Sequence, residues 1–353
     1  MKLEQKRRPR IGIIGCGQIA KIRHVPELAR CESAELAGFY DYIPEHAQAL
    51  AGQYGGRVYG QYEEMLDDGT VDGVVICTSN DSHGRISMEA LKRDKYVLCE
   101  KPMCMSLEEA GQVVKADEES GAFYMAAHNQ RFNLAHRKAR EILKSGQMGK
   151  IIAFRCTLAH TGPEHFSINR STSTWYLNKK NSGFGCITDL GIHKCDVLRY
   201  LLDEPFIRVG ALAGIRDKCD AKGNYVDVYD NAVCVLESKS GIMGTLNLSY
   251  SNYGPMENGT VYYCQNGVLR VQYNQDCALE VIMESGETAR YISEENPSSN
   301  VVDAFAKAIQ NRGPSPVNAQ ESYEAMRVVF AIEESARTGA LSISLIKSNW
   351  YVS

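Results

Sequence analysis

The stretch Ile11-Gly-Ile-Ile-Gly15-Cys-Gly17-Gln-Ile-Ala20 decides the fold of this 353-residue chain. A short run rich in isoleucine leads into a GxGxxA turn, and a helix-like segment (IAKIRHVPELAR) follows it. The glycines allow a tight turn and a close approach of the backbone to a pyrophosphate, while the N-terminus of the next helix supplies amide donors. We therefore expect a dinucleotide-binding turn made by Gly15, Gly17, Gln18, Ile19 and Ala20.

An acidic residue follows at the spacing that suits the ribose of the dinucleotide. Asp41 comes 21 residues after Ala20, directly behind the apolar run ELAGFY (35–40). A carboxylate at this place can accept both ribose hydroxyls of NAD and would repel the 2′-phosphate of NADP. The alternative is an aspartate that only begins a turn in the segment DYIPEHA. We expect Asp41 and its neighbour Tyr42 to contact NAD.

Short apolar runs recur through the first 127 residues. Further runs stand at 73–77, 96–99 and 123–127, and segments of helical character lie between them. One such segment begins at Ser106, which has capping-box spacing to Glu109. Unbroken apolar strands that alternate with helices are typical of a parallel sheet covered on both faces. We expect a Rossmann domain, a doubly wound parallel sheet, over residues 1–127.

Two polar segments follow predicted strands of this sheet. TSNDSH (78–83) comes after the run at 73–77, and Glu100-Lys101-Pro102 comes after YVLC (96–99). Ligands of doubly wound sheets bind at the carboxyl ends of the strands, which places both segments beside the nucleotide. Taken alone, the first could be a polar helix cap and the second a surface turn. The residues expected to border the cofactor here are Thr78, Ser79, Asn80, His83, Glu100 and Lys101.

From residue 128 onward the pattern changes. Several strand-like runs, among them DNAVCVLES and GIMGTLNLSY, fill residues 205–295 and are separated by Gly, Asn and Asp turns. They predict a large, mainly antiparallel open sheet in a C-terminal α+β domain (128–353). Asn318 and Glu321 have capping-box spacing at the start of the last helix. The last helices could pack back on the first domain. Expected helices cover 134–146, 188–202, 300–311 and 319–338, with a strand from 151.

A third motif lies in the predicted helix 188–202. At 100° per residue, Asp189, His193, Asp196 and Tyr200 fall within about a 60° arc of one helix face. Asp and His four residues apart are close enough for the carboxylate to orient the imidazole. The residues alone leave three interpretations open: a solvated face, a metal site, or a catalytic pair.

Together these motifs resemble the glucose–fructose oxidoreductase / inositol dehydrogenase / rhizopine-catabolism (Gfo/Idh/MocA) family. The shared pattern is GxGxxA near the start, EKP near residue 100 and DxGxHxxD near residue 190, and the resemblance spans nearly the whole chain. It includes His24, the segment 129–132 (NQRF) and Trp175. One departure is Ser79, where the family often has proline.

The resemblance implies an NAD-dependent oxidoreductase acting on a secondary alcohol of a sugar, a sugar derivative or an inositol-like cyclic polyol. It implies that Lys101, Asp189 and His193 are the catalytic group and that Trp175 lies near the nicotinamide or the substrate. It adds Asn129 to the cofactor contacts and Arg131 to the substrate contacts. It further implies a homodimer or homotetramer formed through the large sheet.

Two other functions stay open at this point. Some relatives of the family process glycosides through a 3-keto sugar, with NAD recycled in place. Others are non-catalytic NAD-binding regulators, against which the retention of Lys101, Asp189 and His193 argues.

The composition of the chain restricts its expected partners, its compartment and the state of its cysteines. A formal net charge of -4 argues against nucleic acid or a membrane surface as partner, and no apolar run approaches the roughly 20 residues of a membrane span. Arg7 and Arg8 precede only the short, glycine-broken IGIIGCG, so we expect a cytoplasmic protein. The twelve cysteines contain no CxxC pair, which favours buried free thiols and no metal site.

Overall fold

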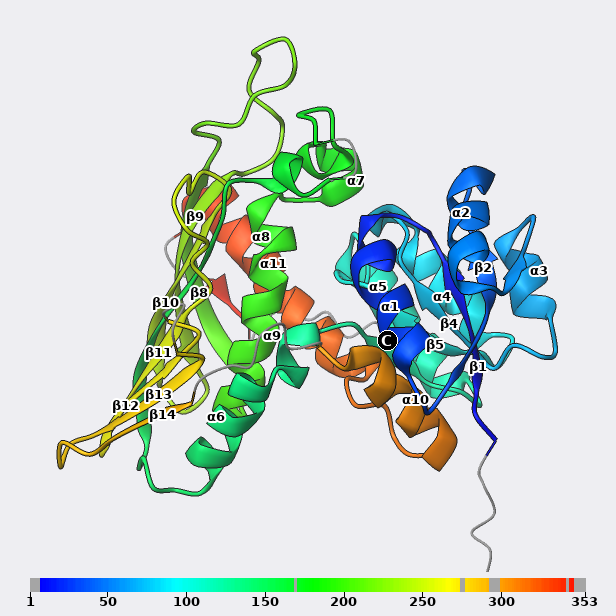
Figure 1. Ribbon diagram of the computed structural model, residues 1–353. Coiled ribbons are helices and arrows are strands. Elements are labelled where there is room, and N and C mark those ends of the chain that lie inside the picture. The colour runs from blue at the N-terminus through cyan, green and yellow to red at the C-terminus, as the bar shows by residue number, and fades with distance from the viewer. Residues whose placement is uncertain (1–6, 168–169, 274–276, 292–298, 341–342, 346–353) are drawn as a thin grey trace, which may run out of the picture. The chain divides into compact units, whose positions relative to one another are not determined.

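The computed structural model describes residues 7–167, 170–273, 277–291, 299–340 and 343–345. The chain divides into two compact units, which are described separately (Figure 1). The first consists of Met1–Asn129 with Ser298–Tyr323, and the second of Gln130–Pro297 with Glu324–Ser353. A segment near the C-terminal end of the chain thus belongs to the first unit.

The first unit is built on a six-stranded sheet with the order β3-β2-β1-β4-β5-β6. Every pair of neighbours is parallel, which confirms the doubly wound Rossmann sheet. The inner strand β1 is fully buried at Ile11, Ile13 and Ile14, as its unbroken apolar sequence predicts. The strands are β1 (Arg10–Ile14), β2 (Glu35–Tyr40), β3 (Arg57–Val58), β4 (Gly73–Ile76), β5 (Tyr96–Cys99) and β6 (Tyr124–Ala126).

Helices lie between these strands along the chain. The Ser106 side chain accepts a hydrogen bond from the Glu109 N–H at 3.1 Å, so the predicted cap forms. The Phe305 ring on α10 meets the Phe123 ring edge-on at 5.8 Å, which holds α10 in this unit. The helices are α1 (Val25–Arg30), α2 (Pro44–Tyr54), α3 (Tyr62–Asp67), α4 (His83–Leu91), α5 (Leu107–Glu119) and α10 (Val301–Asn311), with a π-helical turn at Ala20–His24 and a 3-10 turn at Asn80–Ser82.

The second unit contains a nine-stranded sheet in the part of the chain that the structure describes, with the order β14-β13-β12-β11-β7-β10-β9-β8-β15. Neighbours are antiparallel except β7 and β10, which confirms the predicted mainly antiparallel sheet. The strands are β7 (Ile151–Ala159), β8 (Phe206–Gly214), β9 (Asn231–Ser238), β10 (Met243–Ser249), β11 (Thr260–Cys264), β12 (Gly267–Val271), β13 (Leu279–Met283), β14 (Thr288–Tyr291) and β15 (Ile343–Ser344).

Helices cover one face of this sheet (Figure 1). Along β9, Ala232, Cys234 and Leu236 are buried, whereas the alternating Val233 and Val235 are 56% and 54% exposed. Successive side chains of a strand point to opposite faces of the sheet. One face is therefore covered by helices, and the outer face carries exposed apolar side chains. The helices of this unit are α6 (Leu134–Lys144), α7 (Lys179–Ser182), α8 (Cys186–Asp189), α9 (Gly191–Leu202) and most of α11 (Ala319–Thr338), with 3-10 turns at Asn129–Phe132, Pro163–His165 and Trp175–Leu177.

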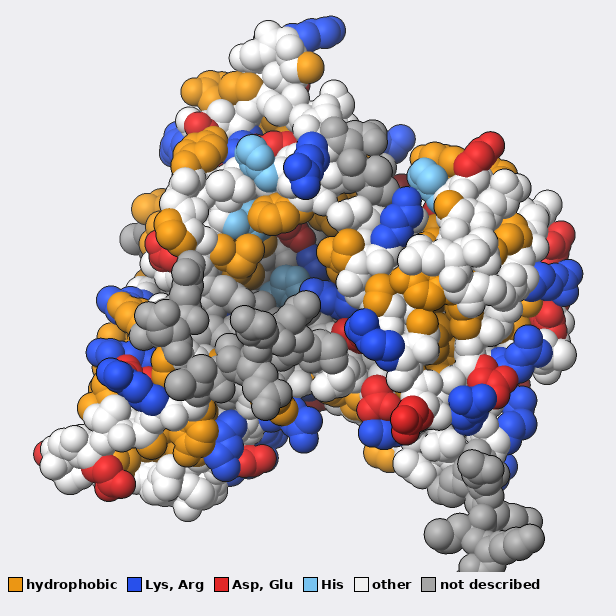
Figure 2. Space-filling model, viewed as in Figure 1, with side chains coloured by type: hydrophobic (Ala, Val, Ile, Leu, Met, Phe, Trp, Pro, Cys, Tyr) orange, Lys and Arg blue, Asp and Glu red, His pale blue; other side chains and the backbone are white. Residues whose placement is uncertain are grey.

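All twelve cysteines are free thiols, and all but the half-buried Cys219 are buried. Within the described ranges, no helix is long and apolar enough to cross a membrane. The same residues contain no group of three or more His, Cys, Asp or Glu side chains that could hold a metal ion. On the face drawn in Figure 2, basic side chains are interspersed with acidic ones.

Candidate active site

The predicted cofactor residues of the first unit gather at one edge of its sheet. Each of five parallel strands ends within three residues of one of the predicted segments, and the carboxyl ends of parallel strands share an edge. The segments are Gly15–Ala20 after β1, Asp41 and Tyr42 after β2, residues 78–83 after β4, Glu100 and Lys101 after β5, and Asn129 after β6.

The glycine turn has the geometry that its sequence predicts. Gly15 has a φ of +93°, and a Cβ there would lie 2.7 Å from the backbone of Cys77 and Thr78. Only glycine fits this position, because both the space and the backbone conformation exclude a side chain. A Cβ on Gly17 would meet nothing within 4 Å, so this side of the turn is open to a ligand. The turn can therefore hold a pyrophosphate.

The Asp41 carboxylate has two local hydrogen bonds. It accepts from the Cys16 N–H at 2.7 Å and from the Ile43 N–H at 2.8 Å. Asp41 thus begins a turn and also ties the end of β2 to the glycine turn, so the two interpretations of this residue are compatible. A carboxylate has about four acceptor sites, which leaves capacity for ribose hydroxyls. Tyr42 beside it is 82% exposed.

His83 joins the segments that follow β4 and β5. Its Nδ1 lies 2.7 Å from the Pro102 carbonyl oxygen, and its Nε2 lies 3.1 Å from that of Thr78. Carbonyl oxygens only accept, so both ring nitrogens carry a proton. Burial of the ring opposes the charge, but Cys99 and the two carbonyls outweigh it and raise the pKa of His83 to about 9. The buried imidazolium holds the two segments together.

Glu100 fixes the backbone beside Lys101. Its Oε1 lies 2.8 Å from Nε2 of His24, and its Oε2 accepts from the Lys101 N–H at 3.0 Å. Burial would raise the pKa of Glu100, but His24, Arg23 and Lys101 lower it well below its ordinary value. The carboxylate is therefore a buried anion, and His24 is the partner that the sequence analysis left without a role.

In the second unit a glycine loop leads to the predicted catalytic helix. Gly185 has a φ of +62°, and a Cβ there would lie 2.3 Å from the Tyr229 carbonyl oxygen. The expected single helix 188–202 is wrong in detail, because α8 ends at Asp189 and α9 begins at Gly191. Leu190 joins them in right-handed helical conformation, so His193 lies one turn beyond Asp189.

Asp189 is held by a tyrosine that the sequence analysis did not single out. The Tyr250 hydroxyl donates to Asp189 Oδ2 at 2.9 Å, and the Tyr250 side chain is fully buried. The His160 ring packs against the Tyr250 ring at 5.4 Å between centroids, with an interplanar angle of 30°. Asp189 is therefore connected to the ends of β10 and β7.

Asp196, which shares the predicted helix face, is buried in an ion pair. The Arg131 guanidinium donates to both of its oxygens, from Nε at 2.9 Å and from Nη2 at 2.7 Å. The Arg131 guanidinium carbon also lies 5.2 Å from the centre of the Tyr200 ring. This part of the helix face is thus not solvated, and much of the Arg131 head group is engaged within the unit.

The predicted site residue Trp175 stacks on Tyr176, with ring centroids 3.8 Å apart.

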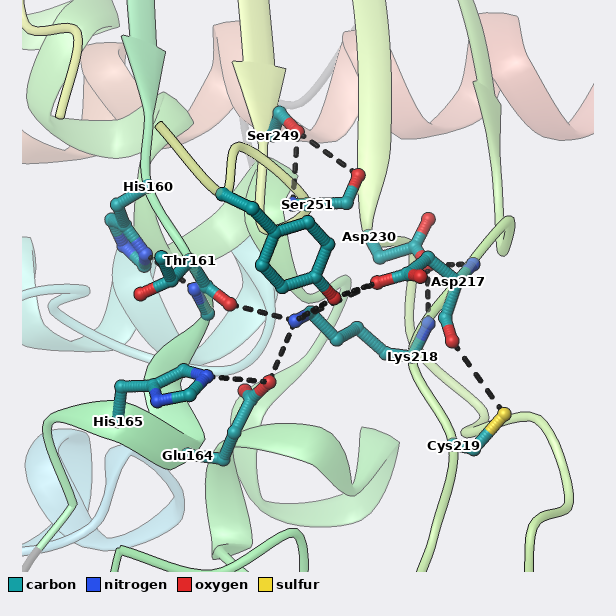
Figure 3. A network of polar contacts seen from close by, with 12 residues as sticks. His160, Thr161, Glu164, His165, Asp217, Lys218, Cys219, Asp230, Ser249 and Ser251 are labelled. Atoms are coloured by element: carbon teal, nitrogen blue, oxygen red, sulfur yellow. Dashed lines mark hydrogen bonds and ion pairs between the residues drawn. The ribbon is translucent and has the colours of Figure 1, made fainter. Parts of the chain in front are cut away.

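A polar network surrounds Lys218, also in the second unit (Figure 3). Its ammonium donates to the Thr161 carbonyl oxygen at 2.6 Å, to Glu164 Oε1 at 2.6 Å and to the Tyr253 hydroxyl at 3.0 Å. Burial would lower the pKa of Lys218, but Glu164 and Tyr253 raise it. The three donor positions of the lysine are satisfied, so this network fastens the loop after β7 to its neighbours.

Comparison with known proteins gives two family matches, one within each unit of the chain. Residues 9–128 match the family model described as oxidoreductase family, NAD-binding Rossmann fold, and residues 136–270 match the GFO/IDH/MocA C-terminal domain. The chain belongs to the Gfo/Idh/MocA family of oxidoreductases. Its first unit is the NAD-binding Rossmann domain of that family.

Individual Gfo/Idh/MocA proteins match over almost the full length. The 1,5-anhydro-D-fructose reductase of Ensifer adhaerens is 26% identical, over 94% of this chain and 97% of that protein. The myo-inositol 2-dehydrogenase of Thermotoga maritima is 24% identical, over 92% and 96%. A solved structure of levoglucosan dehydrogenase with NADH and levoglucosan has a TM-score of 0.85 at 21% identity, over 96% and 99% of the two chains.

The Gfo/Idh/MocA motif positions are divided between the two units. Lys101 belongs to the first unit, together with the predicted cofactor residues from Gly15 to Asn129. Asp189, His193, Arg131 and Trp175 belong to the second unit. The predicted catalytic residues therefore come from both units.

Proposed function

We propose that this protein is an NAD-dependent dehydrogenase that transfers a hydride between a secondary alcohol and NAD. The observation that carries the proposal is the Asp189–His193 pair, one helical turn apart, with the carboxylate of Asp189 held by a buried tyrosine. A carboxylate fixed next to a histidine suits a general base that takes the proton of a hydroxyl group.

The residues have separate roles in this proposal. Bound NAD supplies the hydride acceptor. His193 takes the hydroxyl proton, because the ordinary pKa of histidine, about 6.5, suits a base near neutral pH. Asp189 orients the imidazole and stabilises its protonated form. Lys101 donates to the alcohol oxygen and stabilises the charge that develops there. The alcohol thus loses one hydride and one proton and becomes a carbonyl compound.

The cofactor contacts are proposed at the carboxyl edge of the Rossmann sheet. The open side of the glycine turn would receive the pyrophosphate, and Asp41 would receive the ribose hydroxyls. Trp175 and Asn129 would lie near the nicotinamide. The remaining proposed cofactor contacts are Tyr42, Thr78, Ser79, Asn80, His83, Glu100 and Lys101.

The substrate is proposed to be a sugar, a sugar derivative or a cyclic polyol. The names of the relatives support this class, since they include 1,5-anhydro-D-fructose, myo-inositol and levoglucosan. Arg131 and Trp175 are proposed to contact it, together with Lys101, Asp189 and His193. Because Arg131 already binds Asp196 through two nitrogens, its contribution to substrate binding would use its other donors or act through the helix that carries Asp196.

Two further properties belong to the proposal. The exposed apolar side chains on the outer face of the large sheet support a homo-oligomer, a dimer or a tetramer, formed through that face. Eleven buried free thiols suit a reducing compartment, and we propose the cytoplasm.

The direct test is NADH formation by the purified protein against a panel of inositols, free sugars and glycosides. We expect NADH to accumulate in proportion to the oxidised alcohol for at least one class. Cleavage of a glycoside without net NADH would instead identify chemistry through a 3-keto sugar with the cofactor recycled in place. NAD binding without turnover of any compound would indicate a regulatory protein and would overturn the proposal.

A further inference from the structure

We propose that Tyr250 is a positioning residue that sets the orientation and charge of the Asp189 carboxylate through its hydroxyl group. The inference rests on the proposed function, in which Asp189 serves the base His193. Tyr250 stands 61 positions after Asp189 in the sequence, directly behind β10, and belongs to none of the motifs described above.

The sheet holds the Tyr250 backbone in place. Tyr250 directly follows the last residue of β10, and its N–H donates to the Asp230 carbonyl oxygen at 2.8 Å. The side chain is fully buried, and its hydroxyl lies 2.9 Å from Oδ2 of the half-buried Asp189, within the range of an O–H···O hydrogen bond. A rigid element therefore presents one donor to one oxygen of the proposed catalytic carboxylate.

The ring of Tyr250 is held from a second side. His160, at the end of β7, packs over it, and the Gly162 N–H donates to His160 Nδ1 at 2.9 Å. Because Nδ1 accepts, the neutral His160 ring carries its proton on Nε2, and the ring cannot turn over without losing this bond. The phenol is thus enclosed by two strand ends and points at Asp189.

The phenol acts as a donor only. Burial, followed by the charge of Asp189, raises the pKa of Tyr250 well above 10. A neutral phenol donates a stronger hydrogen bond to the ionised carboxylate than to the protonated carboxyl group. Tyr250 therefore favours the charged form of Asp189, which is the form that can stabilise a protonated imidazole.

Other titratable groups also surround this pair. Cys186 and His193 lie on the helical segments that adjoin Asp189, Tyr176 lies in the 3-10 turn Trp175–Leu177, and His160 and Asp230 lie at strand ends. Each of them is retained when only the Tyr250 hydroxyl is removed. A change in pH dependence after that substitution therefore reports the lost hydrogen bond to Asp189.

The test compares Tyr250→Phe with Tyr262→Phe. Tyr262, on β11 of the same unit, is also fully buried, but its hydroxyl has no hydrogen-bond partner in the described structure. Tyr250→Phe should lower kcat roughly 10- to 100-fold, the range expected for a hydrogen bond to a charged group. It should also move the acidic limb of the kcat/KM profile to higher pH. NAD affinity should stay unchanged, and Tyr262→Phe should leave all of these properties near wild type.

A double-mutant cycle with Asp189→Asn separates this inference from the function on which it rests. If Tyr250 acts through Asp189, Tyr250→Phe adds little further loss in the Asp189→Asn background. If Asp189→Asn is inactive but Tyr250→Phe behaves like Tyr262→Phe, the inference is wrong and the proposed function stands. If Asp189→Asn itself retains wild-type turnover, the proposed function fails first.

A second probe covers the case in which Tyr250→Phe does not fold. Site-specific 3-fluorotyrosine at position 250 keeps the ring and the hydroxyl but makes the phenol more acidic. A more acidic neutral phenol is a stronger hydrogen-bond donor to Asp189, so we expect the acidic limb of the kcat/KM profile to move to lower pH than in wild type. An acidic limb identical to that of wild type would overturn the inference.

Discussion

The Nε2 atom of His24 lies 2.8 Å from Oε1 of Glu100, and both side chains are buried. His24 ends the π-helical turn that follows the glycine turn, and Glu100 follows β5. The second oxygen of Glu100 accepts from the backbone N–H of Lys101 at 3.0 Å. This contact therefore connects the cofactor-binding turn with the lysine that we propose to contact the substrate oxygen.

The first prediction concerns the effect of the Glu100 carboxylate on the pH dependence of stability. The folded protein holds the pKa of Glu100 below its unfolded value of roughly 4.3. The carboxylate thus contributes stability above that pH, and the contribution is lost as pH falls below it. Glu100→Gln should cost about 1–3 kcal/mol at pH 7 and flatten the dependence of stability on pH below about 5. Denaturant unfolding across pH checks this, and parallel curves for the two proteins would contradict it.

The second prediction concerns His83, whose contribution to stability changes with pH in the opposite direction to that of Glu100. Its pKa is raised to about 9 in the folded protein, against roughly 6.5 in the unfolded chain. Its stabilising contribution is complete below about pH 6.5 and disappears as pH rises through 9. The unfolding free energy of wild type should therefore drop more between these pH values than that of His83→Gln. A larger drop in the variant would refute the assignment of a buried imidazolium.

The third prediction concerns the choice of cofactor. With the Asp41 carboxylate at the ribose position, kcat/KM should be higher with NAD than with NADP, because a 2′-phosphate would face a like charge. Asp41→Asn keeps the size of the side chain but removes the charge, so it should reduce the preference for NAD roughly 10-fold or more. Equal values for both cofactors in the wild-type protein would mean that Asp41 does not set the choice.

The fourth prediction concerns assembly. Leu212, Val233, Val235 and Met243 on the outer face of the large sheet are 54% to 69% exposed. We expect sedimentation at micromolar concentration to show a dimer or a tetramer, and Val235→Lys to shift it toward the monomer. Leu134→Lys is the matched control, since Leu134 is also exposed, at 59%, but belongs to the helix α6 and not to a strand of the sheet. A monomeric wild-type protein would rule out this interface.

Much of the fold follows from local sequence patterns. Five of the parallel strands coincide with unbroken apolar runs, and the capping residues Ser106 and Asn318 begin helices as predicted. β3 has no such signal, because Arg57 and Val58 are a two-residue strand with both side chains exposed. Its position comes from pairing with β2, which is a property of the assembled sheet.

The sequence indicates candidate site residues only where they lie in compact motifs. Gly15, Asp41, Lys101 and Asp189 could be singled out because spacing or position after a strand gives each of them a local signal. Tyr250 and Lys218 could not, since their partners are 61 and 54 positions away in the sequence. A buried tyrosine or lysine has no pattern of its own until the fold brings its acceptor within hydrogen-bond distance.

The fifth prediction tests the central claim most directly, by steady-state turnover of His193→Ala together with a titration of NAD binding. If His193 is the base, kcat should fall roughly 10²- to 10⁴-fold while NAD affinity stays at the wild-type level. Unchanged NAD affinity also shows that the Rossmann domain of the variant is folded. Turnover near that of wild type in His193→Ala would contradict the account, because His193 would then be only a residue of the α9 surface.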